Sequence, residues 1–311
     1  VMTERLRIFL DKRREMKEKK LWLVMLLMSF CVSAQVKGVI KDSILGKPIP
    51  YATIFIENEN TGTTTEIDGS FTLDVKEDKK LIISALGYHV KKTAINNETI
   101  FLKPKIIELN EVVIEKSKNN KQLEIGKTNT TKVRHRSGEE SWINSKYFQY
   151  DTIYKNTKFI SKIIFFTKSE VKNSKFKLRL YNINKEGFPG SDMLSEDVIV
   201  TVKKGNHKTI IDISSHHIVF PKTGFFVGYE ILKIESNKYD FKYSELNSTK
   251  TITKVYFAPS FECNLSDEEN TFIFYNGKWQ KRMRIHNNET GSLKKFNNKI
   301  IEPSIRVILT N

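Results

Sequence analysis

The chain has 311 residues, and its 52 Lys and Arg against 36 Asp and Glu give a formal charge of +16 at pH 7. A hydrophobic content of 39% is enough to build a core and excludes wholesale disorder. The two cysteines, Cys31 and Cys263, are too few for a disulfide framework or a Cys-rich zinc site. This length accommodates one large domain or two ordinary ones.

A short apolar run near the N-terminus has the three-part pattern of a secretory signal. Met16 opens a basic stretch, residues 21–32 are apolar, and small residues lead to a cleavage position after Ala34. The run is shorter than the roughly 20 apolar residues that cross a bilayer. We therefore expect a cleaved signal helix, with an uncleaved anchor or a lipid anchor at Cys31 as the alternatives. Met16 is the favoured translation start.

Residues 1–34 are thus interpreted as an upstream extension and a signal peptide. They hold eight Lys or Arg and four Asp or Glu, so cleavage lowers the formal charge from +16 to +12. No integral membrane span is expected after cleavage. Cys263 is then the one remaining cysteine, and its apolar neighbours favour a small buried hydrophobe over a reactive nucleophile.

The segment 35–115 consists of short β-type runs separated by turn signals, without a helical period. Ser70–Val75 alternates strictly, whereas Leu81–Ala85 is continuously apolar, as in a strand covered on both faces. The expected strands lie at 36–41, 51–57, 70–75, 81–85, 89–95, 99–102 and 107–114. These runs predict a small seven-stranded antiparallel β-sandwich.

Four motifs in this segment follow one another in a distinctive order. They are Gly38-Val-Ile-x-Asp42, Gly46-x-Pro48-Ile-Pro50, Asp68-Gly69-x-Phe71-x-Leu73 and Leu81-x-x-Ser84-x-x-Gly87-Tyr88. Together they resemble the carboxypeptidase regulatory-like domain, a transthyretin-like sandwich of exported Gram-negative proteins. The resemblance implies a fold and an accessory role, and it brings no peptidase residues.

The stretch Glu108–Ile114 is similar to the segment that follows this domain in TonB-dependent outer-membrane receptors. The alternative is that it is simply the last strand of the sandwich. The secretory signal predicts an exported protein, located in the periplasm, associated with the outer membrane, or at the cell surface.

Residues 116–140 are polar and basic, and we interpret them as a linker or a loosely held strand segment. The cluster Arg134-His-Arg136 within them is the one place where a basic patch can be argued. A second domain is expected over 141–311. Its predicted strands lie at 159–166, 175–181, 198–202, 208–213, 224–231, 251–257, 271–280 and 305–309.

This second segment predicts a larger, jelly-roll-like β-sandwich. Asn276-Gly277 is the strongest turn signal, because both residues tolerate the positive φ of a type I′ hairpin turn. Lys residues that alternate with apolar residues, as in 175–181, are interpreted as a solvent-facing row. They do not form the concentrated patch that nucleic acid requires, so no nucleic-acid partner is expected.

Two motifs suggest a metal without requiring one. His216 and His217 are adjacent, so in a strand they would point to opposite faces, and we expect one packed and one exposed side chain. The acidic loop Asp267–Glu269, with Asn264 and Asn270 beside it, could offer oxygen ligands to structural calcium but lacks EF-hand spacing. We expect a solvated loop, no metal and no cofactor.

Aromatic residues provide the candidate binding site. Tyr239, Phe241 and Tyr243 share one face of a strand, and Tyr275 and Trp279 flank the Asn-Gly turn. Flat rings of this kind bind sugar faces, although alternating aromatics also form sandwich cores.

Catalytic motifs are absent from the sequence, including Gly-x-Ser-x-Gly and His-Glu-x-x-His. The resulting hypothesis is a non-catalytic exported adhesion or ligand-recognition protein, with a glycan or another envelope component as its partner. A scaffold that docks to an outer-membrane complex is the alternative, and a hydrolase is the least favoured. Ligand identity and oligomeric state stay open.

Overall fold

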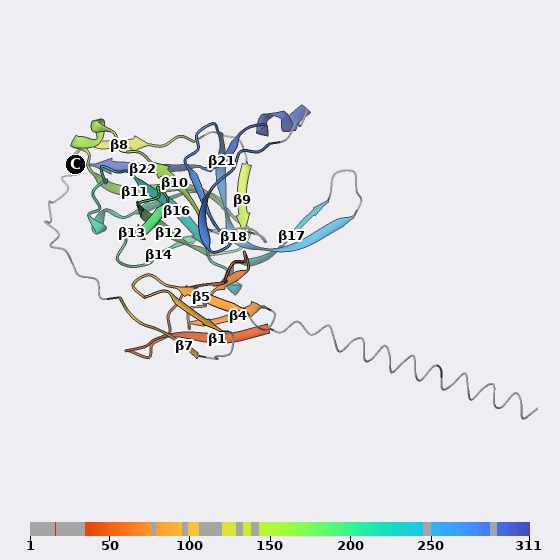
Figure 1. Cartoon of the computed structure of the whole chain (residues 1–311). Helices are drawn as coiled ribbons and strands as arrows, with labels where there is room; N and C mark the ends of the chain where they lie inside the picture. Colours follow the sequence, from red (N-terminus) through yellow and green to blue (C-terminus); the bar gives the residue numbers. More distant parts are fainter. Residues whose placement is uncertain are drawn as a thin grey trace, which may run out of the picture.

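The computed structural model (Figure 1) describes residues 16, 35–75, 79–94, 99–105, 120–128, 133–137, 143–244, 250–286 and 291–311. The expected signal helix and the segment 107–114 lie outside these ranges. The elements within them are β-strands and 3-10 helices of no more than six residues, which confirms the all-β prediction. None of the helices in this part of the chain is long and apolar enough to cross a membrane.

The first domain is a sandwich of two sheets. The three-stranded sheet has the order β4-β1-β7, with β1 at Gln35–Asp42, β4 at Ser70–Asp74 and β7 at Thr99–Leu102. The four-stranded sheet has the order β3-β2-β5-β6 and consists of β2 (Thr53–Ile56), β3 (Gly62–Thr64), β5 (Lys80–Ser84) and β6 (Lys91–Ala94). Between the sheets lies an apolar core that includes Ile40, Ile54, Phe71, Leu81 and Ile83.

Two details of this domain differ from the sequence prediction. The strand β3 forms at Gly62–Thr64, between the expected strands 51–57 and 70–75, because its backbone pairs with β2. The pairing of β1 with β7 is parallel, so the domain is not purely antiparallel. Leu81 and Ile83 are buried in the first core while Ile82 packs against the second, so β5 is covered on both faces as predicted.

The second domain is a larger sandwich whose smaller sheet has the order β13-β12-β16-β10-β19-β20, with β14 paired to β12. Its strands are β10 (Ile143–Phe148), β12 (Ser174–Ile183), β13 (Pro189–Asp192), β14 (Val198–Val202), β16 (Phe225–Ile231), β19 (Thr271–Tyr275) and β20 (Lys278–Lys281).

The larger sheet has the order β17-β18-β11-β22-β8, with β15 on β11 and both β9 and β21 on β18. Its strands are β8 (Gln122–Ile125), β9 (Val133–Ser137), β11 (Phe159–Ser169), β15 (Gly205–Asp212), β17 (Lys238–Ser244), β18 (Thr251–Ser266), β21 (Ile300–Pro303) and β22 (Ile305–Thr310). The chain alternates between the sheets from β10 to β11 to β12, and again later, which is the expected jelly-roll-like pattern.

The segment interpreted as a linker or a loosely held strand contributes strands to this domain. β8 pairs with β22, and β9 pairs with β18, so the second domain begins before residue 141. The Asn276-Gly277 turn forms as predicted, with φ of 50° and 76°, and joins β19 to β20.

The two domains meet through the outer faces of β2 and β12. Lys177 and Arg179 of β12, expected on a solvent-facing row, are instead 1% and 8% exposed, because the first domain covers this face. Lys177 Nζ lies 3.0 Å from an Asp197 carboxylate oxygen and donates to Tyr51 O of the first domain at 3.0 Å. The alternation of charge and apolar residue in β12 thus reflects two buried faces.

Phe55 is a second point of contact between the domains. Its ring belongs to the hydrophobic core of the second domain and meets Phe274 edge-on at 5.4 Å. The turn residue Gly277 lies so close that a Cβ there would be 3.1 Å from the Phe55 ring. The hairpin β19–β20 therefore rests on the first domain.

Candidate functional site

The hairpin of β17 and the first half of β18 extends away from the body of the second domain (Figure 1). Tyr239, Phe241 and Tyr243 alternate with exposed residues along β17, so they share one face of the hairpin as predicted. Tyr256 of β18 lies opposite Tyr239 on the same face. All four rings are half-buried.

These rings pack against one another. Phe241 stacks on Tyr243 with centroids 6.1 Å apart, and it meets Tyr256 edge-on at 5.1 Å. Partial burial raises the pKa of the Tyr239 hydroxyl, which therefore stays protonated at neutral pH. The face is a neutral aromatic surface with part of each ring accessible.

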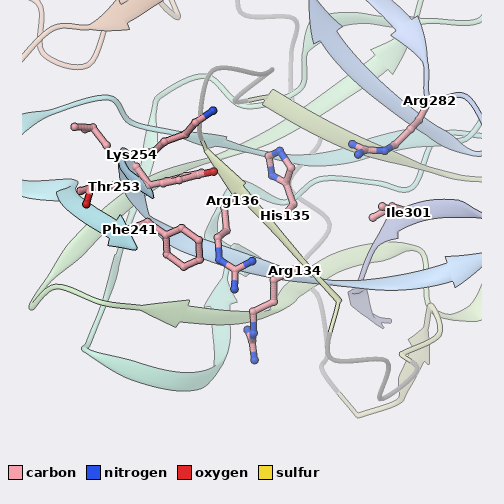
Figure 2. Close-up of a pocket in the computed structure, with 10 residues that line it drawn as sticks. Arg134, His135, Arg136, Phe241, Thr253, Lys254, Arg282 and Ile301 are labelled. Atoms are coloured by element: carbon pink, nitrogen blue, oxygen red, sulfur yellow. The ribbon is translucent and has the colours of Figure 1, made fainter. Parts of the chain in front are cut away.

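A guanidinium group covers one of these rings. Arg136 comes from β9, which pairs with β18 around Phe257 and Phe261 and so reaches the root of the hairpin. Its guanidinium carbon lies 5.0 Å from the centroid of the Phe241 ring, within cation–π distance. Figure 2 shows Arg136 directly beside Phe241.

The two residues line an open groove with a volume of about 690 Å³. Its described lining residues carry several positive side chains and include no Asp or Glu. They are Arg134, His135, Arg136, Phe241, Thr253, Lys254, Val255, Tyr256, Arg282 and Ile301. The groove combines aromatic surface with concentrated positive charge.

A chain of buried polar groups fixes the floor of the groove. His135 Nδ1 shares a hydrogen bond of 3.1 Å with the Tyr229 hydroxyl, and the Asn144 amide lies 3.4 Å from His135 Nε2. Asn144 Oδ1 accepts a hydrogen bond of 3.2 Å from Arg282 Nη1. In Figure 2 the Arg282 guanidinium points toward His135, so its position is set from within the sandwich.

Arg134 is anchored at the edge of the groove. Its Nη2 donates to Asn206 Oδ1 at 3.1 Å and lies 3.9 Å from a Glu262 carboxylate oxygen. Part of its charge is therefore balanced at this edge of the groove.

The remaining two predicted site residues are elsewhere. Tyr275 and Trp279 belong to β19 and β20 of the other sheet, so the structure does not join them to the β17 row. Trp279 is half-buried and meets Tyr181 and Phe274 edge-on at 5.3 and 5.5 Å. Its ring packs against these residues of the second domain, and only Phe241 of the five predicted residues lines the groove.

The sequence-based prediction missed the four basic residues of the groove. One local signal was present, since Arg134 and Arg136 belong to the noted basic cluster. Lys254 and Arg282 carry no such signal, because they come from β18 and from the chain after β20 and meet the cluster only in the folded protein.

The paired histidines and the acidic loop were the two candidate metal sites in the sequence. Among the described residues, no group of three or more His, Cys, Asp or Glu is placed to hold a metal ion. His216 ends a 3-10 helix rather than lying in a strand, and both it and His217 are half-buried. In the acidic loop, Asp267 pairs with Lys299 at 2.7 Å and Glu269 with Arg284 at 3.1 Å.

Cys263 is buried in β18, and burial raises the pKa of its thiol to about 12. The thiol is therefore protonated at neutral pH and is not a nucleophile, since the thiolate is the reactive form.

Comparison with known proteins identifies the first domain. Residues 36–114 match the family model described as a CarboxypepD_reg-like domain, which confirms the resemblance noted in the sequence. The TonB-dependent receptor SusC of Bacteroides thetaiotaomicron is 31% identical over 87 residues, which are 28% of this chain and 9% of the receptor. The chain thus spans less than a tenth of that relative.

Comparison with solved structures gives only distant overlaps. The cysteine protease and lectin-like domains of Cwp84, a surface layer associated protein of Clostridium difficile, overlap with 84% of this chain and 59% of theirs, at 9% identity and a TM-score of 0.33. The T=1 particle derived from infectious bursal virus overlaps with 89% and 58%, at 8% identity and a TM-score of 0.24. Both scores are too low to argue a shared fold.

Proposed function

We propose that this protein, whose first domain is a CarboxypepD_reg-like domain, is a non-catalytic module of the cell envelope that binds an acidic polymer through the groove at the root of β17 and β18. The family assigned to the first domain and its similarity to part of an outer-membrane receptor support the envelope location. The groove supplies the binding chemistry, and an acidic glycan is the ligand class that it fits best.

The observation that carries this proposal is the pairing of Arg136 with Phe241. Apolar faces of sugar rings stack on aromatic side chains, and a guanidinium beside the ring attracts a carboxylate or sulfate on the same polymer. Lys254 and Arg282 extend the positive charge along the groove, whose described lining includes no carboxylate. A neutral glycan would gain binding energy only from stacking on the Phe241 ring. A nucleic acid would require a longer row of basic residues to follow its phosphates.

Binding to an acidic polysaccharide such as alginate, compared with neutral dextran, tests the proposal. We expect alginate to bind and dextran to bind at least about tenfold more weakly, which corresponds to roughly 1.4 kcal/mol. Raising the salt concentration weakens the alginate complex, since charges beyond about 3 Å are screened in 1 M salt.

Variants in the groove locate the binding. Arg136→Ala and Phe241→Ala each weaken alginate binding, and Arg136→Lys restores part of it because the positive charge is kept but the flat stacking surface is lost. Lys254→Ala is matched by Lys242→Ala, which removes a lysine from the exposed opposite side of the same hairpin. Equal loss of binding in Lys242→Ala and Lys254→Ala would contradict a binding site in the groove. It would indicate that the polymer is attracted only by the net charge of the protein.

Docking to an outer-membrane complex is the second candidate function, favoured by the similarity of the first domain to part of SusC. Cross-linking in cells that recovers an outer-membrane protein with the wild-type chain and with Arg136→Ala would support it. If Arg136→Ala no longer recovered that partner, the groove itself would be the binding site for it, and docking through the first domain would be contradicted.

A further inference from the structure

A second cavity, with a volume of about 430 Å³, opens between the two sheets of the second domain away from the hairpin. This volume lies in the range of small-molecule sites, which is roughly 300–1,000 Å³. The strand β10 contributes Lys146 from one sheet, and β18 and β21 contribute Asn264 and Glu302 from the other. The loop 266–270 forms one side of its rim.

An ion pair lies at the inner end of this cavity. Lys146 Nζ contacts Glu302 Oε1, and the two residues are only 6% and 3% exposed. Burying two charges costs more than such a pair usually returns, and apolar residues of the same size would stabilise the sandwich at least as well. Stability alone therefore does not explain the pair.

The second carboxylate oxygen of Glu302 is the informative atom. Glu302 Oε2 is buried and has no hydrogen-bond partner among the described residues. Buried carboxylate oxygens are normally bonded, so one without a donor calls for an explanation, and a ligand that donates to it provides one. Glu302 is one of the residues that line the cavity, so a small rearrangement of its carboxylate would present Oε2 to a ligand.

The charges around the cavity select the kind of ligand. Its lining holds the carboxylates of Asp267, Glu268 and Glu302 against the ammonium groups of Lys127 and Lys146. Asp267 is also paired with Lys299, so the charges balance and favour neither an anion nor a cation. An ammonium ligand at Glu302 would be repelled by Lys146, which lies beside it. A neutral group that both donates and accepts, which is a hydroxyl, satisfies Glu302 Oε2 and Lys146 Nζ at once.

The rim has the surfaces that bind the rest of such a molecule. Tyr147 and Tyr154 provide aromatic surface, and the Tyr154 ring is held edge-on to Tyr150 and tilted against Phe220 at 6.0 and 5.2 Å. Gln149 and Asn270 add amide groups. We propose that this cavity is a binding site for a neutral polyhydroxylated ligand, a single saccharide unit, with Glu302 and Lys146 as its hydroxyl-binding pair.

Titration of the chain from Gln35 onward with glucose, galactose, mannose and N-acetylglucosamine tests this site. Saturation-transfer NMR detects the weak binding expected of a single sugar. At least one sugar should give saturable binding, and Glu302→Gln should weaken it roughly tenfold or more, because hydrogen bonds to charged groups are the strong ones. Glu186→Gln, in an exposed loop, is the matched control and should leave binding unchanged.

Removing one charge of a buried pair risks unfolding, so a second variant is needed. The double variant Lys146→Met with Glu302→Leu keeps the volume and should remain folded by circular dichroism, yet it should no longer bind the sugar. Absence of saturable binding by all four sugars would overturn the proposal. So would unchanged binding in both the Glu302→Gln and the double variants.

The same experiments distinguish the proposed groove site from the proposed cavity site. Arg136→Ala should keep the sugar affinity, and Glu302→Gln should keep alginate binding. Failure of alginate binding with intact sugar binding would overturn the proposed function alone, and the reverse result would overturn the cavity alone.

Discussion

Thr53 Oγ1 of the first domain donates a hydrogen bond of 2.5 Å to Glu230 Oε1 of the second. Both side chains are buried, and the other carboxylate oxygen of Glu230 lies 3.3 Å from Arg179 Nε. The first domain therefore supplies a donor to a charge network inside the second. Two domains joined in this way should unfold as one unit.

Glu230→Ala should destabilise the protein by about 3–5 kcal/mol, because it leaves the buried charge of Arg179 with less compensation. Thr53→Val should cost about 1–3 kcal/mol, since Glu230 then lacks its donor from the first domain. Urea denaturation followed by tryptophan fluorescence and by circular dichroism measures both. Two separate transitions in the wild-type protein, or unchanged midpoints in both variants, would show that the domains are independent.

Gly277→Ala should destabilise the protein by about 1–2 kcal/mol, because Gly277 has a φ of 76° and an added Cβ would press on Phe55. Gly187→Ala is the control, since Gly187 has a similar φ of 84° but open space around it. The difference between the two melting temperatures isolates the contact with the first domain. Equal shifts would mean that the hairpin does not rest on Phe55.

Lys233, in a groove lined by both domains, should make stability depend on pH. Burial lowers the pKa of its ammonium to about 8, from 10.5. Between those values the unfolded chain holds more protons than the folded one, so stability rises as pH increases through this window. Lys233→Met should stabilise the protein at neutral pH by on the order of 1 kcal/mol and flatten this rise. Urea midpoints at several pH values between about 7.5 and 9.5 provide the check.

Cys263 should be unreactive in the folded protein, because its thiol pKa of about 12 leaves almost no thiolate at neutral pH. In a chain that begins at Gln35, a colourimetric thiol reagent should titrate one thiol in denaturant and react only slowly without it. Fast reaction in native buffer would indicate that β18 opens around this residue.

The parts of the fold that the sequence predicted are those with a local cause. Alternation placed Phe176, Leu178 and Leu180 on one face of β12, and Asn276-Gly277 formed its turn because both residues accept positive φ. The opposite face of β12 was misjudged, because nothing near Lys177 and Arg179 in the sequence signals that another domain covers them.

In the candidate site too, the features with a local cause were predicted and those that depend on the fold were missed. The shared face of Tyr239, Phe241 and Tyr243 follows from a period of two, which the sequence displays directly. Its cationic partner Arg136 is more than a hundred residues away and arrives through the pairing of β9 with β18. The apolar content around β8 and β9 is low, so the sequence gives only a weak strand signal there. These segments become strands because their backbones pair with β18 and β22 of the larger sheet.

The position of β22 has a consequence for how the protein is made. This strand, at Ile305–Thr310, pairs with β11 on one side and with β8 on the other, so two earlier strands depend on it. During synthesis the larger sheet cannot close until these residues have left the ribosome, and its pairings join segments far apart in the chain, which slows folding. Whatever the earlier strands have formed, the larger sheet therefore stays open until β22 has been synthesised.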